Sequence, residues 1–136
     1  MHHVRTTVIA CGLSFLAGAV AVWAQQQAQS ATRREPQFEN GEVRAWKSTI
    51  MPKQPLTMHR HDHGRALIAL TDGQLTVVDR SGKRLNVYNW KAGRAYWLDA
   101  DPPGQVHADL NDTSTPIEVI VVELKNDKAQ PSHPAR

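Results

Sequence analysis

The sequence predicts an all-β domain. Between residues 38 and 124 the chain is built of short segments that are β-branched or alternate between apolar and polar side chains, and turn residues separate these segments. No segment in this range has the apolar spacing of an amphipathic helix. Roughly eight such segments at close intervals are typical of a β-sandwich or a β-barrel.

The first three strands are expected over 42–50, 56–61 and 66–71. Residues 42–50 alternate in side-chain character, as a half-buried strand does. Segment 56–61 begins directly after Pro55, and 66–71 is an apolar run that Asp72 ends. The Asp-Gly pair at 72–73 is a strong hairpin signal, so we predict a tight turn there.

Five more strands are expected, over 74–79, 84–90, 95–98, 106–110 and 116–124. Ser81 and Gly82 predict a second hairpin turn. Two prolines and Gly104 mark a further turn before 106. The last segment is rich in Val and Ile, which favour strands. Together with the first three, these segments predict the all-β class for the whole domain.

Residues 1–24 have the layout of a secretory signal peptide. A basic, acid-free start precedes an apolar run over 8–22, and Val22 and Ala24 occupy the positions that a signal peptidase reads. The run is short for a membrane anchor, which needs about 20 apolar residues, and an uncleaved anchor is the alternative. We therefore expect a periplasmic or secreted protein, without stable membrane insertion once the leader is cleaved.

The rest of the chain is expected to contain one folded domain. A polar linker is predicted over 25–37, the domain over 38–124, and a flexible, proline-containing tail over 125–136. A chain of this length can bury a single core. Cys11 is the only cysteine and lies in the leader, so the mature chain is expected to have neither disulfides nor thiolate metal sites.

The charge pattern gives no sign of a nucleic-acid partner. The net charge is +3, and the leader takes one positive charge, Arg5, with it. Basic residues are scattered along the domain and are not clustered with aromatic residues. No serine lies in a nucleophile elbow, and no Gly-rich phosphate loop is present. The expected partner is a small-molecule ligand or substrate, with no nucleic acid.

Four histidines predict a metal site. His59, His61 and His63 alternate along one segment, so their side chains would share one face of a strand, and His107 follows a turn farther along the chain. Imidazole is the commonest metal-ligating side chain. Alternate Cα atoms of a strand lie about 6.6 Å apart, and two imidazoles at that spacing can reach one ion at about 2.1 Å. The other interpretation is that these are ordinary surface or core histidines, as most single histidines are.

The second of these motifs resembles that of the cupins, a superfamily of small double-sheet jelly rolls. The cupin motif contains Pro-x-Gly, two residues, His, three residues and Asn. Here Pro102, Gly104, His107 and Asn111 reproduce it without a gap. The preceding glycine, Gly93, is present, but eight residues separate it from the proline, where cupins have five.

The first motif matches the cupin pattern in part. His59 and His61 fit its His-x-His, and Gly73 fits its closing glycine. The opening glycine position holds Lys53, and the glutamate position, counted back from the closing glycine, holds Ala66. The resemblance covers about residues 54–124. It implies a cupin-like double-stranded antiparallel jelly-roll barrel and, as is common among cupins, a homodimer.

The resemblance also implies the metal ligands. Cupin metals are typically held by both histidines and the glutamate of the first motif and by the histidine of the second, but Ala66 has no ligand atom. We therefore favour a three-histidine centre of His59, His61 and His107, as in the cysteine-dioxygenase-like branch, and His63 is the alternative source of a fourth ligand. The cofactor would be a divalent transition metal such as Fe, Zn, Cu, Ni or Mn, among which imidazole ligands do not choose.

Arg65 is expected to point away from this site. If Ala66 faces the barrel interior, alternation places Arg65 on the outside, where its charge is solvated. A bulge that shifted the register would turn Arg65 inward, and it would then hold an anionic group of a substrate.

Two classes of function follow. In the first, the protein is an exported, dioxygenase-like metalloenzyme whose metal acts as a Lewis acid or redox centre on a small organic molecule. In the second, it is a non-catalytic barrel that binds a small molecule, or a metal-handling protein that uses His59, His61 and His63 as an exposed cluster. The missing glutamate favours the second class, and the sequence alone leaves both open.

Overall fold

The computed structural model describes residues 31–127, which contain eight strands and no helix. The strands are β1 (Arg33–Glu39), β2 (Val43–Ile50), β3 (Arg65–Ala69), β4 (Gly73–Val78), β5 (Arg84–Trp90), β6 (Ala95–Leu98), β7 (Ala108–Asn111) and β8 (Ile117–Leu124). The predicted leader, the first six residues of the predicted linker and most of the predicted tail lie outside the described residues. Within residues 31–127, no helix is long and apolar enough to span a membrane.

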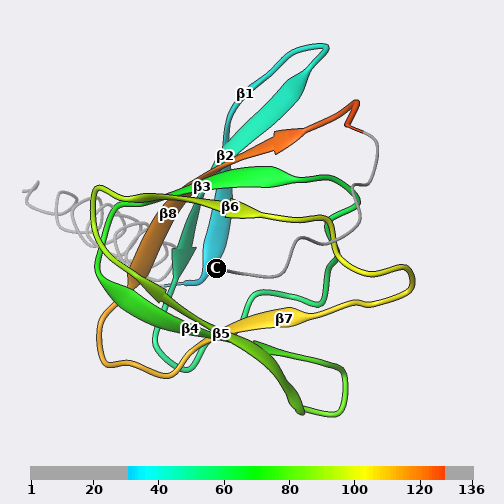
Figure 1. Cartoon of the computed structure of the whole chain (residues 1–136). Helices are drawn as coiled ribbons and strands as arrows, with labels where there is room; N and C mark the ends of the chain where they lie inside the picture. The colour runs from blue at the N-terminus through cyan, green and yellow to red at the C-terminus, as the bar shows by residue number, and fades with distance from the viewer. Residues whose placement is uncertain (1–30, 128–136) are drawn as a thin grey trace, which may run out of the picture. The chain divides into compact units, whose positions relative to one another are not determined.

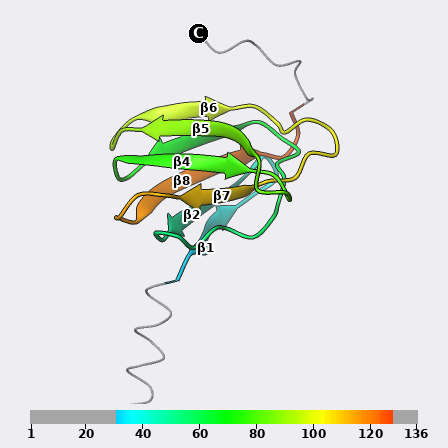
Figure 2. The ribbon, with the colours of Figure 1, turned by 90° about the horizontal axis from the view of Figure 1, so that it is seen from below.

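The strands form two antiparallel sheets (Figures 1 and 2). The larger sheet has the order β1-β2-β8-β3-β6, and the smaller has the order β5-β4-β7. Buried apolar side chains from both sheets meet in one core, among them Ile50, Leu67, Leu75 and Val119. Each such side chain stabilises the fold by about 1.5–3 kcal/mol. This confirms the predicted all-β jelly roll.

Alternation along β8 and β3 places charged residues in the interior at one end of the larger sheet. Along β8 every second residue is buried, and the inward row ends at Glu123. Along β3 the inward row starts at Arg65 and continues through Leu67 to Ala69. Arg65 lies opposite Glu123 in the register of the two strands. The apolar core therefore gives way, at this end, to a polar interior.

Two expectations about the first half of the domain are wrong. Residues 56–61 form no strand, and only an isolated bridge pairs His59 with His107 there. A strand that was not expected, β1, begins at Arg33, inside the range predicted to be a linker. β1 is an edge strand beside β2, and an edge position tolerates Pro36 because it leaves one side of the backbone without a ladder partner. The other predicted strands each overlap one of β2 to β8.

One predicted hairpin is confirmed and one is wrong. Ser81 and Gly82 connect the paired strands β4 and β5, where Gly82 has a φ of 81° and Asp79 accepts hydrogen bonds from Ser81. The Asp-Gly pair at 72–73 instead carries the chain from β3 in one sheet to β4 in the other. Gly73 is needed there for close packing, since a Cβ atom would lie 2.6 Å from Cγ1 of Ile117.

Candidate metal centre

The structure brings three of the four predicted histidines together. His59 and His61 come from the segment between β2 and β3, and His107 directly precedes β7. Two backbone hydrogen bonds join His59 to His107, at 2.9 and 2.8 Å, and their ring centroids lie 4.4 Å apart. One potential ligand atom from each of the three side chains lies within 4.8 Å of the others, and no second such group occurs among residues 31–127.

Each of the three imidazoles has an acceptor at its Nδ1 atom. These acceptors are the Thr57 carbonyl oxygen at 2.7 Å from His59, a carboxylate oxygen of Glu123 for His61, and Oδ2 of Asp101 at 3.3 Å from His107. An Nδ1 that donates to such an acceptor carries the proton, so the Nε2 atom keeps its lone pair. Nε2 of His59 is buried and has no hydrogen-bond partner. The donor set therefore fits a metal ion bound through Nε2 atoms.

Burial keeps His59 and His61 uncharged. His61 and His107 are 5% and 4% exposed. Burial lowers the pKa of His59 to about 4, although the negative charge of Asp109 acts in the opposite direction. Burial also lowers the pKa of His61, against the raising effect of its bond to Glu123. Because a metal binds neutral imidazole, both rings are ready to ligate at neutral pH.

Glu123 is a buried partner of the site that the sequence reasoning missed. Its carboxylate accepts hydrogen bonds from His61 and from both Nε and a terminal nitrogen of Arg44, the latter two at 3.0 and 2.5 Å. Burial raises the pKa of Glu123, but the bonds from His61 and Arg44 outweigh this and lower it. Glu123 is thus a carboxylate anion that fixes the ring of His61. The alternation of β8, continued through Ile117 and Val119, is the signal that could have found it.

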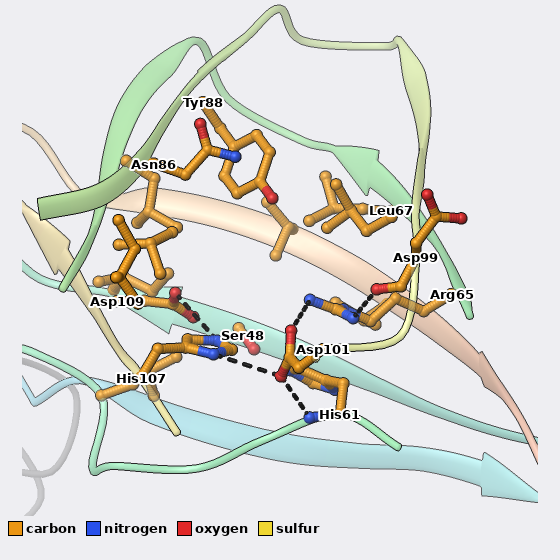
Figure 3. Close-up of a pocket in the computed structure, with 18 of the residues that line it drawn as sticks. Ser48, His61, Arg65, Leu67, Asn86, Tyr88, Asp99, Asp101, His107 and Asp109 are labelled. Carbon is orange, nitrogen blue, oxygen red and sulfur yellow. Dashed lines mark hydrogen bonds and ion pairs between the residues drawn. The ribbon is translucent and has the colours of Figure 1, made fainter. Parts of the chain in front are cut away.

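Asp101 holds the other side of the site. Oδ2 of Asp101 accepts a hydrogen bond from the backbone nitrogen of His61 at 2.6 Å and also faces His107 (Figure 3). Its other carboxylate oxygen lies 3.8 Å from the guanidinium group of Arg65. Burial raises the pKa of Asp101, and the bonds from His107 and His61 more than offset this and lower it. One carboxylate thereby orients two of the three histidine residues.

The expected outward position of Arg65 is wrong. Arg65 is 6% exposed and donates to the carbonyl oxygen of Asp99 at 2.9 Å from inside the barrel. No bulge is needed for this, because β3 starts at Arg65 and its inward row is the one that contains Arg65 and Leu67. Ala66 belongs to the opposite face, so the residue of β3 nearest the centre is an arginine and not the motif's glutamate position.

His63 lies outside the group of three. Its Nδ1 atom is 2.6 Å from Oδ1 of Asp127, whose other oxygen accepts a hydrogen bond from the Gly64 nitrogen at 2.8 Å. His63 therefore continues the alternation of histidines in the sequence, but its side chain contacts Asp127 and not the other histidines. It is not within ligand distance of His59 and His61.

A cavity of about 390 Å³ lies beside the histidines, between the two sheets (Figure 3). This volume is in the range of small-molecule sites. Its wall is partly apolar, with Trp46, Leu67 and Val121 among its lining residues. The polar lining residues include Arg34, Ser48, Asn86, Tyr88, Asp99, Asp101, Gln105, Asp109, Arg65, His61 and His107. A small organic molecule would fit here with both apolar and charged contacts.

No family model and no curated protein matches the sequence. Several solved structures are similar to this one in fold. A cupin domain from Bordetella pertussis superposes with a TM-score of 0.59 at 21% identity, over 71% of this chain and 95% of that chain. An RmlC-like cupin family protein from Methanocaldococcus jannaschii has a TM-score of 0.52 at 16% identity, over 70% and 81%. This chain has the cupin fold.

A third similar structure, an uncharacterized protein with a double-stranded β-helix domain from Klebsiella pneumoniae, has a TM-score of 0.50 at 23% identity, over 69% of this chain and 76% of that chain. At sequence identities this low, the superpositions show the cupin fold and no particular activity. The same cupin barrel carries many unrelated chemistries, so function has to be argued from the residues of the site.

Proposed function

We propose that this cupin-fold protein holds a divalent transition metal with His59, His61 and His107 and binds a small organic molecule in the adjoining cavity. The observation that carries the proposal is the convergence of the three side chains while each Nδ1 atom is occupied by an acceptor of the protein. A ring held in this way presents Nε2 in one orientation, which is the arrangement that metal-ligating histidines show.

A metal bound there would supply Lewis-acid or redox chemistry at the cavity wall. The residues of the chain have separate tasks around it. Glu123 and Asp101 orient His61 and His107, and the buried position of these groups excludes water from the ligands. Three neutral imidazoles suit Fe, Zn, Cu, Ni or Mn, so the metal has to be identified by analysis.

Arg65 supports a substrate or ligand with an anionic group. Its guanidinium group lies in the cavity wall, and Tyr88 points into the same cavity (Figure 3). An arginine recognises carboxylate or phosphate with two parallel hydrogen bonds. Asp101, at 3.8 Å, offsets part of the arginine's charge and keeps its position. A small molecule with a carboxylate or phosphate group is thus a ligand that this wall fits.

A binding barrel without catalysis is the second proposal. It is favoured by the way in which Asp101 pairs with Arg65 and His107, because groups that are engaged with one another are less available as acid or base. The two proposals differ in turnover and not in metal binding. Metal-loaded protein that binds a carboxylate ligand tightly and leaves it unchanged under air would support the binding barrel.

Export and dimerisation belong to the proposal as well. The leader-like residues 1–24 support a periplasmic or secreted protein, and cupins commonly form homodimers. N-terminal sequencing of the exported protein should find a chain that starts at Gln25, whereas a chain that retains Met1 would contradict cleavage. Sedimentation equilibrium should give twice the mass of the mature chain.

Metal analysis tests the central claim. Mature protein should be purified without an affinity tag, chelator or nickel resin and should contain about one ion per chain. Titration of the metal-free protein with several divalent metals should then show stoichiometric binding. A protein that binds none of these metals would contradict the metal assignment, and only the assignment of the cupin fold would remain.

A further inference from the structure

Asp109 lies beside His59 and His107, at one of the unspecified positions of the second cupin motif. It lies in β7, two residues after His107, so the two side chains share one face. Oδ2 of Asp109 is 3.6 Å from Nε2 of His59, and Oδ1 is 3.7 Å from Nε2 of His107. Figure 3 shows the Asp109 carboxylate turned toward the ring of His107. One carboxylate thus faces both rings on their free side.

These contacts are not hydrogen bonds. The distances of 3.6 and 3.7 Å exceed hydrogen-bond length, and Nε2 of His59 has no partner although it is buried. With Nδ1 of His59 and His107 directed at acceptors, both Nε2 atoms face the Asp109 carboxylate. Electron-rich atoms that face one another in a largely buried place are unfavourable unless a cation lies between them.

The distances are those of ligands around one ion. Two atoms that each lie about 2.1 Å from a metal are about 3.0–3.4 Å apart at neighbouring coordination positions. The two contacts of Asp109 exceed this by a few tenths of an ångström, and Asp109 is not in the group of ligand atoms that all lie within 4.8 Å of one another, so its carboxylate would have to turn toward the ion. Asp109 is only 15% exposed, and its backbone is fixed by pairing with Val77 in β4 and by a hydrogen bond from Leu56.

We propose that Asp109 is the fourth protein ligand of the metal, which makes the centre a set of three imidazoles and one carboxylate. This rests on the proposed three-histidine function. The carboxylate offsets one charge of the divalent ion and adds an oxygen ligand to three nitrogens. His61, His107 and Asp109 all line the cavity, so the remaining coordination positions face the bound molecule.

Asp109→Asn tests the proposal, with Asp99→Asn as the matched control. Both changes remove one negative charge from the same cavity at nearly constant shape, but Asp99 bonds to the indole nitrogen of Trp97 and not to the histidines. Zn²⁺ affinity of the otherwise intact mature protein should fall more than about tenfold in Asp109→Asn, since even outer partners of a ligand cost 10–100-fold. The control should bind Zn²⁺ as the wild type does.

The visible absorption spectrum of the Co²⁺-loaded protein would not change if Asp109 had a purely structural role. The visible absorption of bound Co²⁺ depends on the number and type of its ligands, so Asp109→Asn should change the spectrum and Asp99→Asn should not. Wild type that binds no metal would overturn the three-histidine function itself. Wild type that binds metal, with an unchanged affinity and spectrum in Asp109→Asn, would overturn only the role of Asp109.

A crystal structure of the wild type with Zn²⁺ covers the case in which Asp109→Asn does not fold. A carboxylate oxygen of Asp109 at about 2.0–2.2 Å from the ion supports the proposal. A separation that leaves room for a water molecule between ion and carboxylate overturns it.

Discussion

The Glu123 carboxylate and the His61 imidazole, 62 positions apart in the sequence, are hydrogen bonded in the interior of the barrel. The side chain of Glu123 is 1% exposed, whereas Arg44, which binds the same carboxylate, is half exposed. The contact therefore connects the molecular surface to a proposed metal ligand through one buried anion. Glu123 sits in β8 between β2 and β3, so the position of His61 is tied to three neighbouring strands.

Glu123→Gln should weaken metal binding without abolishing it. The amide keeps the shape of the side chain but accepts a weaker hydrogen bond from His61, and loss of such a partner typically costs 10–100-fold in metal affinity. Titration of the metal-free protein with Zn²⁺ measures this. Glu118→Gln is the matched control, because Glu118 lies on the same strand and pairs with Lys47 away from the site. Equal affinities of the two variants would contradict the orienting role of Glu123.

His107→Ala should remove most of the metal binding, and His63→Ala should remove little of it. Two ligands from one segment, His59 and His61, rarely hold a divalent ion tightly, whereas His63 is engaged with Asp127. Isothermal titration of the wild type and both variants with several metals measures the difference. The reverse order of effects would favour an exposed cluster that uses His63, and this is the outcome that contradicts the three-histidine centre.

The proposed ligand histidines could be predicted from the sequence, whereas their contacts with Glu123 and Asp101 could not. The spacing of His59, His61 and His107 matches the cupin motifs in part, and the structure brings these three side chains together. Glu123 and Asp101 carry no motif and reach the site through strand pairing and a loop, which spacing alone does not reveal. Asp109 could have been found, since alternation from His107 places both side chains on one face.

Counting along a motif also misplaced Arg65. The motif spacing places the expected glutamate at Ala66 and so predicts that Ala66 points inward. In the structure β3 starts at Arg65, and the inward-facing residues are Arg65, Leu67 and Ala69. One residue of register moves a side chain to the other face of a sheet. The strand over Arg33–Glu39 was not expected for another reason: its proline and its charges indicate a linker, and only pairing with β2 makes it an edge strand.

Gly73→Ala should destabilise the domain by about 1–3 kcal/mol. The added Cβ would lie 2.6 Å from Cγ1 and 2.8 Å from Cδ1 of Ile117, which is completely buried in the core. Urea unfolding of the metal-free protein measures the change. Gly41→Ala is the control, because a Cβ there meets nothing within 4 Å. Equal midpoints for both variants would show that the β3–β4 connection relaxes more easily than the packing indicates.

The metal-free protein should lose stability as the pH falls from about 6.5 to about 4. His59 has a pKa near 4 in the folded protein and an ordinary value of 6.5 in the unfolded chain, so between these values the unfolded state binds the extra proton. Stability therefore rises with pH across this window, by about 3 kcal/mol for this one residue. His61, whose pKa is also lowered by burial, adds to the effect in the same direction. Urea unfolding at a series of pH values, with chelator present, measures the slope.

Two asparagine variants separate His59 from histidines in general. His59→Asn keeps a donor for the Thr57 carbonyl oxygen, and His63→Asn keeps a donor for Asp127, because the asparagine amide takes the place of imidazole Nδ1. The first should flatten the dependence of the free energy of unfolding on pH between about 4 and 6.5. The second should leave the steep dependence in place. A wild-type free energy of unfolding that is level across this window would show that the His59 imidazole is protonated as readily in the barrel as in water.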